Sequence, residues 1–229
     1  MLVYYRIMNN LILITSIIKT PNKPLSYINT RSIFSSRERF EQTKNTIQTI
    51  REKIPNSKIM IVECSELSDE EYDYFKNNCD YFLNLINNQN AVDKIYSKSK
   101  SLGEGTMTIF AIDFIKENNI EFDNFFKISG RYWLSNNFYY TNFENNDVIV
   151  HYINNDVNNC CTALYKLHKS NVDDFHNFLI SNINLMINCI GYEILFSIFL
   201  KNNVPNKIVN LDKIGVSGHI SVSTDFINV

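Results

Sequence analysis

Residues 11–18 read Leu-Ile-Leu-Ile-Thr-Ser-Ile-Ile, a short apolar run that is typical of a strand buried on both faces of a sheet. Ser35 and Glu38 follow after a loop and form a capping box, which predicts a helix that ends at Pro55. A second strand is expected over residues 58–64. A strand, a helix and a strand within about fifty residues make a βαβ unit, in which the two strands are parallel. The sequence therefore predicts an α/β fold with a parallel sheet.

The same alternation continues toward the middle of the chain. Ser68 and Glu71 form a second capping box, which opens a short helix, and a third strand is expected over residues 79–85. The polar residues 87–100 predict a loop or flap. Residues 102–117 then predict a helix whose apolar side chains face the core.

The pattern changes after residue 132. Residues 148–153 and 162–167 predict two strands with no helix between them, and residues 171–187 and 190–201 predict two helices. A terminal segment over residues 207–222 carries Gly215 and Gly218. There is no internal repeat and no linker long enough to separate domains. We therefore expect one domain over residues 1–229, with an elaborated C-terminal half.

Composition excludes several classes of protein. The chain has 229 residues, of which 45% are hydrophobic and 20% charged, as in soluble globular proteins. Its net charge of −2 does not favour general nucleic-acid binding. The five cysteines are odd in number and form no C-x-x-C pair, which argues against a zinc knuckle and a disulfide framework. No apolar run is long enough to span a bilayer and no signal peptide is evident, so we expect a cytoplasmic protein.

The strand at residues 125–132, Phe-Phe-Lys-Ile-Ser-Gly-Arg-Tyr, carries the main candidate site. Ligands of α/β proteins bind at the carboxyl ends of parallel strands, and Arg131 stands at that end. Its planar fork of donors suits phosphate or carboxylate. Gly130 leaves room for a ligand, and Trp133 is a candidate wall of the pocket. The alternative is a structural arginine beside packed aromatic side chains.

Other basic residues are candidates for the same anion. Arg31 lies in a loop before the first helix, whereas Arg39 and Lys44 are expected on its solvated face. Lys100 and Ser101 precede the helix at residues 102–117, where the amino end favours a diphosphate. The alternative is a charged loop with a capping serine.

Two carboxylates and a histidine remain as candidates. Glu63 ends the second strand and is either a hydrogen-bond acceptor for a ribose or base, or a solvated residue. Glu193 stands in an apolar helix and is either a partly buried general base or a solvent-facing side chain. His219 is a candidate for phosphate or metal binding, whereas His151 is expected to be ordinary.

The order of these pieces resembles small GT-A-type glycosyltransferases that act on nucleotide sugars, of the compact bacterial and large-DNA-virus kind. The resemblance covers most of the chain and rests on Leu13-Ile-Thr-Ser-Ile-Ile18, Arg31-Ser-Ile-Phe-Ser-Ser-Arg-Glu-Arg-Phe-Glu-Gln-Thr43, Ile61-Val-Glu-Cys64, Lys100-Ser-Leu-Gly-Glu104, Phe126-Lys-Ile-Ser-Gly-Arg-Tyr132, Tyr192-Glu193 and Ile214-Gly-Val-Ser-Gly-His219. It implies a Rossmann-like, mostly parallel sheet with flanking helices. It also implies a nucleotide-binding half at about residues 9–132 and an acceptor-side half at about residues 133–229.

The resemblance implies a hexosyl or pentosyl transfer from a nucleotide-diphosphate sugar to a glycan or small acceptor. The residues expected to act in it are the catalytic Arg131, Glu193 and Lys100, the donor-binding Thr15, Ser16, Arg31, Glu63, Ser101, Ser129 and Gly130, and the acceptor-binding Tyr132, Trp133 and His219.

The chain departs from the GT-A pattern at the metal site. These enzymes mostly carry a D-x-D motif at the end of the central strand, and Ser129-Gly130-Arg131 takes that place here. We therefore expect no D-x-D metal site, although single carboxylates leave room for a Mn²⁺ or Mg²⁺ ion. Either cationic side chains replace the metal, or the chain is an inactive nucleotide-sugar-binding module. A nucleotidyltransferase on a similar fold is a further alternative.

Overall fold

A central sheet of seven strands organises the computed structural model, which describes residues 8–145, 147–204 and 208–229. The single domain predicted over residues 1–229 therefore includes some residues that the structure does not describe. The strand order is β3-β2-β1-β4-β7-β6-β8. These strands are β1 (Asn10–Ser16), β2 (Ser57–Glu63), β3 (Tyr81–Asn84), β4 (Asn124–Ser129), β6 (Val148–Val150), β7 (Leu164–His168) and β8 (Ile208–Asn210). β3, β2, β1 and β4 are parallel to one another, and β7 is antiparallel to β4 and β6. The mostly parallel α/β sheet expected from the sequence is confirmed.

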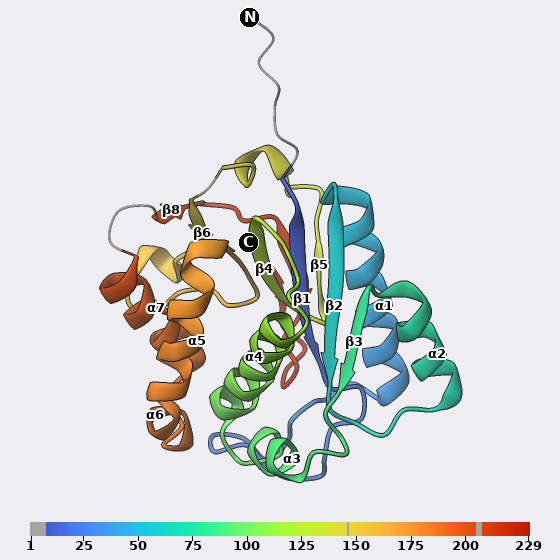
Figure 1. Cartoon of the computed structure of the whole chain (residues 1–229). Coiled ribbons are helices and arrows are strands. Elements are labelled where there is room, and N and C mark those ends of the chain that lie inside the picture. Colours follow the sequence, from blue (N-terminus) through green and yellow to red (C-terminus); the bar gives the residue numbers. More distant parts are fainter. Residues whose placement is uncertain (1–7, 146, 205–207) are drawn as a thin grey trace, which may run out of the picture.

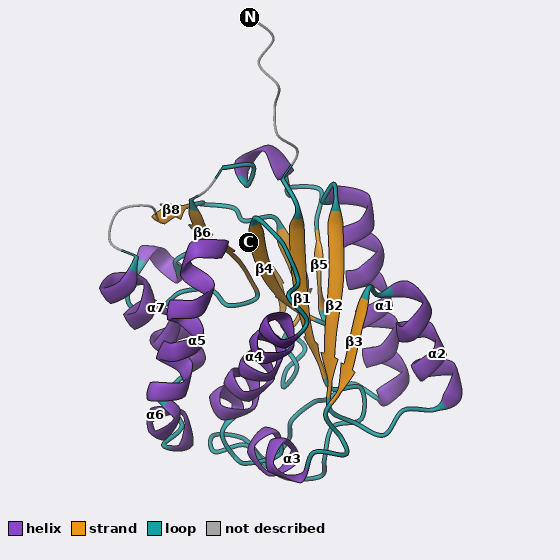
Figure 2. Cartoon of the chain, in the orientation of Figure 1, coloured by secondary structure: helices purple, strands orange, loops and turns teal. Residues whose placement is uncertain are grey.

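Helices cover both faces of this sheet (Figures 1 and 2). They are α1 (Ser36–Lys53), α2 (Asp69–Asn78), α3 (Gln89–Ile95), α4 (Lys100–Glu117), α5 (Val172–Ser181), α6 (Ile183–Ile187) and α7 (Tyr192–Asn203), with short 3-10 turns at Tyr140–Asn142, Ile153–Asn155 and Lys169–Asn171. α1 and α2 lie on one face, and α4, α5 and α7 contribute to the core on the other. A second sheet of three strands, β5 (Tyr132–Leu134), β9 (Val216–His219) and β10 (Phe226–Asn228), packs beside α1.

The apolar run of β1 explains its central position. Leu11 and Leu13 belong to the core that α4 covers, whereas Ile12 and Ile14 belong to the core that α1 covers. Successive side chains of a strand point to opposite faces, so an apolar residue at every position fits a strand that is buried on both sides. The prediction of a doubly buried first strand is confirmed.

Both predicted capping boxes are present. Ser35 Oγ accepts a hydrogen bond from the Glu38 amide at 3.3 Å, and the Glu38 carboxylate accepts from the Ser35 amide at 2.7 Å. Ser68 and Glu71 make the same reciprocal pair at the start of α2. Each box satisfies amides at the helix start that lack intrahelical partners, which fixes where α1 and α2 begin.

Three local predictions were wrong. The stretch at residues 87–100 is not a loop, because it contains α3, which Asn88 caps through the Ala91 amide at 3.1 Å. The helix predicted at residues 171–187 is interrupted at Asn182, whose side chain donates to the Phe178 carbonyl at 2.8 Å. The strand predicted at residues 148–153 ends at Val150 and continues as a 3-10 turn.

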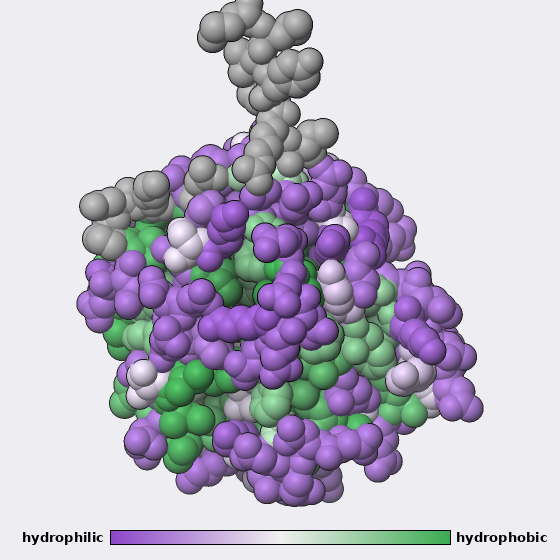
Figure 3. Space-filling view, in the orientation of Figure 1, coloured by the Kyte–Doolittle hydropathy of each residue, from purple (hydrophilic) through white to green (hydrophobic). Residues whose placement is uncertain are grey.

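Part of the apolar surface remains uncovered around α6 and α7. Leu185, Ile187, Ile194 and Ile198 are exposed, and Figure 3 shows hydrophobic surface where α6 lies in the same view. Within the part of the chain that the structure describes, no helix has the length and apolarity needed to cross a bilayer.

Candidate functional site

Three cavities meet at the carboxyl ends of β1 and β4. The arginine cavity, of about 100 Å³, has Arg31, Arg39 and Arg131 on its wall and also contains Thr15 and Ser16. The α7 cavity, of about 260 Å³, is lined by Ser26, Tyr27, Lys100, Ser101, Glu104, Cys189, Gly191, Tyr192 and Glu193. The aliphatic cavity, of about 350 Å³, has Ile153, Ile220, Ile227 and Val229 on one side and polar residues on the other. Lys100 and Glu104 line all three cavities, which therefore adjoin one another.

Arg131 lies on both the arginine cavity and the aliphatic cavity. Its guanidinium carbon is 4.7 Å from the Tyr132 ring centroid, and Nη2 donates to the Tyr132 hydroxyl at 3.2 Å. Its buried Nε has no hydrogen-bond partner among the described residues. Burial favours the neutral guanidinium, but Tyr132, Glu104 and Glu193 outweigh it and raise the pKa of Arg131. Arg131 therefore brings a fixed positive charge to the cavity wall.

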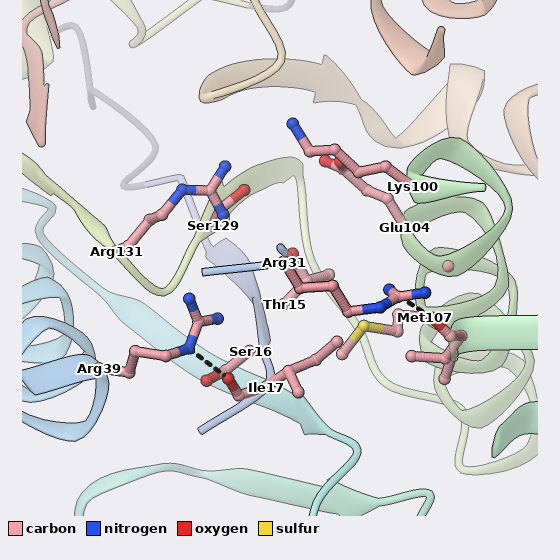
Figure 4. A pocket seen from close by; sticks show the side chains of 12 residues that line it. Thr15, Ser16, Ile17, Arg31, Arg39, Lys100, Glu104, Met107, Ser129 and Arg131 are labelled. Atoms are coloured by element: carbon pink, nitrogen blue, oxygen red, sulfur yellow. Dashed lines mark hydrogen bonds between the residues drawn. The ribbon is translucent and has the colours of Figure 1, made fainter. Parts of the chain in front are cut away.

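Arg39 is the site residue that the sequence analysis misplaced. It does not lie on a solvated face, since it lines the arginine cavity (Figure 4). Its Nε donates to the Ile17 carbonyl at 2.6 Å, and Nη1 donates to the hydroxyls of Ser32 and Ser221, each at 3.1 Å. Burial, together with the charge of Arg131, lowers the pKa of Arg39 to about 10, so it stays charged at neutral pH.

A helical spacing in the sequence identifies the face on which Arg39 lies. Positions 39, 43, 46 and 50 follow one stripe of a helix, and Thr43, Thr46 and Ile50 are all buried. An arginine on the same stripe as buried residues points toward the sheet. That stripe contains two threonines, so an analysis based on apolar residues alone misses it.

Gly130 brings the ends of β1 and β4 together. Its amide donates to the Thr15 carbonyl at 2.9 Å, and its carbonyl accepts from Thr43 Oγ1 at 2.7 Å. A Cβ at this position would lie 2.9 Å from Thr43 Oγ1 and 3.2 Å from Ser16 Cβ. The absence of a side chain thus lets α1 pack against the strand ends, beside the wall that Ser16 and Ser129 form.

Arg31 is held by backbone carbonyls. It donates to the Lys23 carbonyl at 3.0 Å, to the Ile95 carbonyl at 3.3 Å and to the Ser97 carbonyl. Burial lowers the pKa of Arg31. Its contacts tie the loop before α1 to the end of α3, while part of its side chain still lines the arginine cavity.

The first turn of α4 brings Lys100, Ser101 and Glu104 to the site. Ser99 caps the helix by accepting from the Leu102 amide at 3.1 Å, so Ser101 is not the capping residue. Lys100 and Glu104 lie one turn apart and project side by side into the cavity in Figure 4. Glu104 pairs with Lys127, a fully buried lysine of β4. Neither Glu104 nor Lys127 was predicted as a site residue. Glu104 follows Lys100 by four residues, a spacing that places both side chains on the same face of a helix.

Glu63 is buried behind the site. Its Oε1 accepts from the amides of Ile18 and Cys64, each at 3.0 Å, and from Ser65 Oγ at 2.7 Å. Burial raises the pKa of Glu63. Its side chain lies on none of the three cavities, so the predicted contact with a nucleoside stays a prediction.

The predicted base Glu193 and the predicted acceptor residues lie in two places. Glu193 and Tyr132 line the aliphatic cavity, and Glu193 accepts a hydrogen bond from Thr162 Oγ1 at 3.3 Å. Trp133 and His219 instead form an aromatic cluster with Phe226 on the three-stranded sheet, and neither lines the three cavities. His151, expected to be ordinary, does line the aliphatic cavity.

Among the described residues, no group of three His, Cys, Asp or Glu side chains is placed to hold a metal ion. Glu104 and Glu193 are the carboxylates on the α7 and aliphatic cavities, and Lys127 already pairs with Glu104.

Solved structures with similar folds were found, although no family model and no curated protein matches the sequence. The glycosyltransferase GlyE of Streptococcus pneumoniae TIGR4 aligns with a TM-score of 0.51 and 7% identity, over 90% of this chain and 45% of that one. The chain has a GT-A-type fold. Mouse xyloside xylosyltransferase 1 aligns with a TM-score of 0.48 and 7% identity, over 89% of this chain and 84% of that one. A glycosyltransferase involved in glycosylation of the major capsid of PBCV-1 has a TM-score of 0.48 and 13% identity, over 89% and 82%.

At 7% identity the alignment with GlyE establishes the GT-A-type fold alone. In open α/β sheets ligands bind at the carboxyl ends of the parallel strands, and the arginine and aliphatic cavities of this chain lie there. The chemistry of the site must therefore be argued from its own side chains.

Proposed function

We propose that the chain transfers a sugar from a nucleotide-diphosphate sugar to a hydroxyl of a glycan or small acceptor, without a D-x-D metal site. The observation that carries this proposal is Arg131, a charged guanidinium that follows the end of β4 and lines both the arginine cavity and the aliphatic cavity. An arginine fork at this position suits a diphosphate, which is both the anionic part of the donor and the leaving group.

The cations of the site suit this leaving group. Arg39 and Arg131 both line the arginine cavity, and Lys100 stands at the first position of α4. The amino end of a helix favours anions, because its amides point outward and its dipole is positive there. Negative charge that develops on the departing diphosphate is stabilised by such fixed donors, which replaces one task of a metal ion.

Glu193 is the proposed general base of an inverting transfer. It lines the aliphatic cavity and the α7 cavity, which lie beside the arginine cavity and can take the acceptor. The Glu193 carboxylate accepts the proton of the acceptor hydroxyl as the oxygen attacks the anomeric carbon. Thr162 Oγ1, which donates to this carboxylate, orients it.

A donor screen tests the proposal. Thermal stability is measured with UDP-, GDP-, CMP- and TDP-sugars, with and without EDTA, followed by a transfer and hydrolysis assay with each donor that binds. A shift with one donor that survives EDTA, together with turnover, is the expected result. A shift that EDTA abolishes contradicts the metal-free mechanism. Binding without turnover favours an inactive binding module, and no shift with any donor contradicts the proposed substrate class.

A further inference from the structure

Glu104 has a carboxylate oxygen free to meet a ligand at the point where the three cavities join. Its side chain lines the arginine, α7 and aliphatic cavities. Lys127 pairs with Oε1, and Oε2 has no hydrogen-bond partner among the described residues. The Glu104 side chain is only 12% exposed, and the three cavities are the spaces that it lines.

Lys127 fixes the position of the Glu104 carboxylate. The lysine side chain is fully buried, and its ammonium group also donates to Ser129 Oγ at 3.1 Å and to the Thr162 carbonyl at 3.3 Å. Its nitrogen lies 5.8 Å from the Tyr192 ring centroid. An ammonium group with three partners has no freedom to turn, and the carboxylate paired with it is fixed in the same way.

The charges around Glu104 keep it ionised. Burial alone would raise its pKa, but Lys127, Lys100 and Arg131 outweigh burial and lower the pKa of Glu104. Besides neutralising Lys127, a carboxylate that stays negative beside the diphosphate site can stabilise a positive charge that appears only during the reaction.

We infer that Glu104 is a catalytic residue of the proposed transfer, with Oε2 facing the anomeric carbon of the donor sugar. The inference rests on the proposed function. In the reaction the bond between the anomeric carbon and the diphosphate oxygen breaks, and its electron pair leaves with the diphosphate. The acceptor oxygen forms the new bond and gives its proton to Glu193. Glu104 forms no bond; its charge stabilises the oxocarbenium-like transition state, in which the sugar ring is positive.

The two carboxylates thereby have different positions and different tasks. Glu193 lines the α7 and aliphatic cavities but not the arginine cavity, so it stands on the side open to an acceptor. Glu104 also faces the arginine cavity, where the diphosphate is proposed to bind. The anomeric carbon lies between the diphosphate and the acceptor, and Glu104 is the carboxylate common to both sides.

The test compares Glu104→Gln with the wild type and with Glu117→Gln, an exposed change of the same kind at the end of the same helix. For each donor that the wild type turns over, kcat and the donor Kd are measured. We expect Glu104→Gln to lower kcat by about 100-fold to 1,000-fold, the usual effect of removing one electrostatic group. Donor binding stays equal or becomes tighter, because a negative charge near the diphosphate is lost. Glu117→Gln behaves as the wild type.

A double variant separates catalysis from the loss of a buried partner. Glu104→Gln leaves Lys127 without its counter-ion, so Glu104→Gln/Lys127→Met removes both charges. The inference holds if kcat stays low in the double variant while donor binding and melting temperature are retained. It is overturned if the single variant keeps wild-type kcat, or if the double variant recovers it. If the wild type turns over no donor at all, the proposed function itself has failed, and the inference falls with it.

Discussion

Arg131 follows the end of β4 and Glu63 is the last residue of β2, two strands that both pair with β1, yet the two side chains have different surroundings. Arg131 lines the arginine and aliphatic cavities. Glu63 is fully buried, and its Oε1 accepts three hydrogen bonds from residues next to it in the fold. Both positions were selected by the same rule, that ligands bind at the carboxyl ends of parallel strands.

The difference shows what that rule leaves out. A strand end brings a side chain to the right edge of the sheet, but the nearby backbone decides whether the side chain reaches a ligand. The Ile18 and Cys64 amides need an acceptor, and the Glu63 carboxylate supplies it. Arginine has no acceptor to offer such amides, so Arg131 remains available to the cavity.

The largest expected effect separates these two positions directly. Arg131→Ala should lower kcat/KM of the proposed transfer by one to three orders of magnitude, about 1.4–4 kcal/mol, because one fixed positive charge beside the leaving group is lost. The matched control is Arg37→Ala, an exposed arginine of α1 that pairs with Glu41 and Glu70, each at 3.0 Å. Steady-state kinetics of both variants check the prediction. Wild-type kinetics in Arg131→Ala would remove Arg131 from the mechanism.

Local signals explain how much of the fold was predictable. The capping boxes at Ser35 and Ser68 and the apolar residues of β1 depend on a few neighbouring positions, so they were found in the sequence. α3 was missed, because a helix of seven residues that buries only Ala91 and Ile95 gives no periodic pattern. The three-stranded sheet was missed, because its short strands pair Tyr132 with Gly218, far along the chain.

Most of the site residues that were predicted from the sequence lie at the ends of strands or at the start of a helix. Arg131, Ser129 and Lys100 were selected from the sequence, and they lie together on the arginine and aliphatic cavities. Arg39 and Glu104 were missed, because they lie within helices, where packing decides which face meets the cavity. The spacing of residues along a helix shows which of them share a face, but the face that meets the cavity is known only once the buried residues of the helix are known.

An intermediate effect is expected at Gly130, which joins the end of β4 to α1. Gly130→Ala would bring a Cβ to 2.9 Å from Thr43 Oγ1, so we expect a loss of about 1–3 kcal/mol in the free energy of unfolding, as for other overpacked sites. Gly191→Ala is the control, since its Cβ would meet Glu193 Oε2 at 3.4 Å, an ordinary contact. Chemical denaturation measures both. A Gly130→Ala variant with full stability but no donor binding would instead assign the glycine to ligand approach.

The smallest expected effect concerns Glu63, the buried member of the pair that is compared with Arg131. Burial raises the pKa of Glu63, so the folded state prefers the protonated side chain. Its contribution to stability is therefore complete below the unfolded pKa of about 4.3 and is lost as pH rises through the folded pKa. Gln cannot ionise and keeps an oxygen for the same donors. The melting temperature of Glu63→Gln should therefore increase relative to that of the wild type as pH rises from 4 to 8.

An exposed carboxylate nearby provides the control for this pH series. Glu66 lies three residues further along the chain and is exposed. The difference in melting temperature between Glu66→Gln and the wild type should therefore be the same at every pH. A difference at Glu63 that is flat or shrinks with pH would mean that the carboxylate is ionised in the fold. Donor affinity gives the second measurement. Glu63→Gln should bind donor as the wild type does, since Glu63 lies on none of the three cavities, whereas a large loss of affinity would restore the nucleoside contact expected from the sequence.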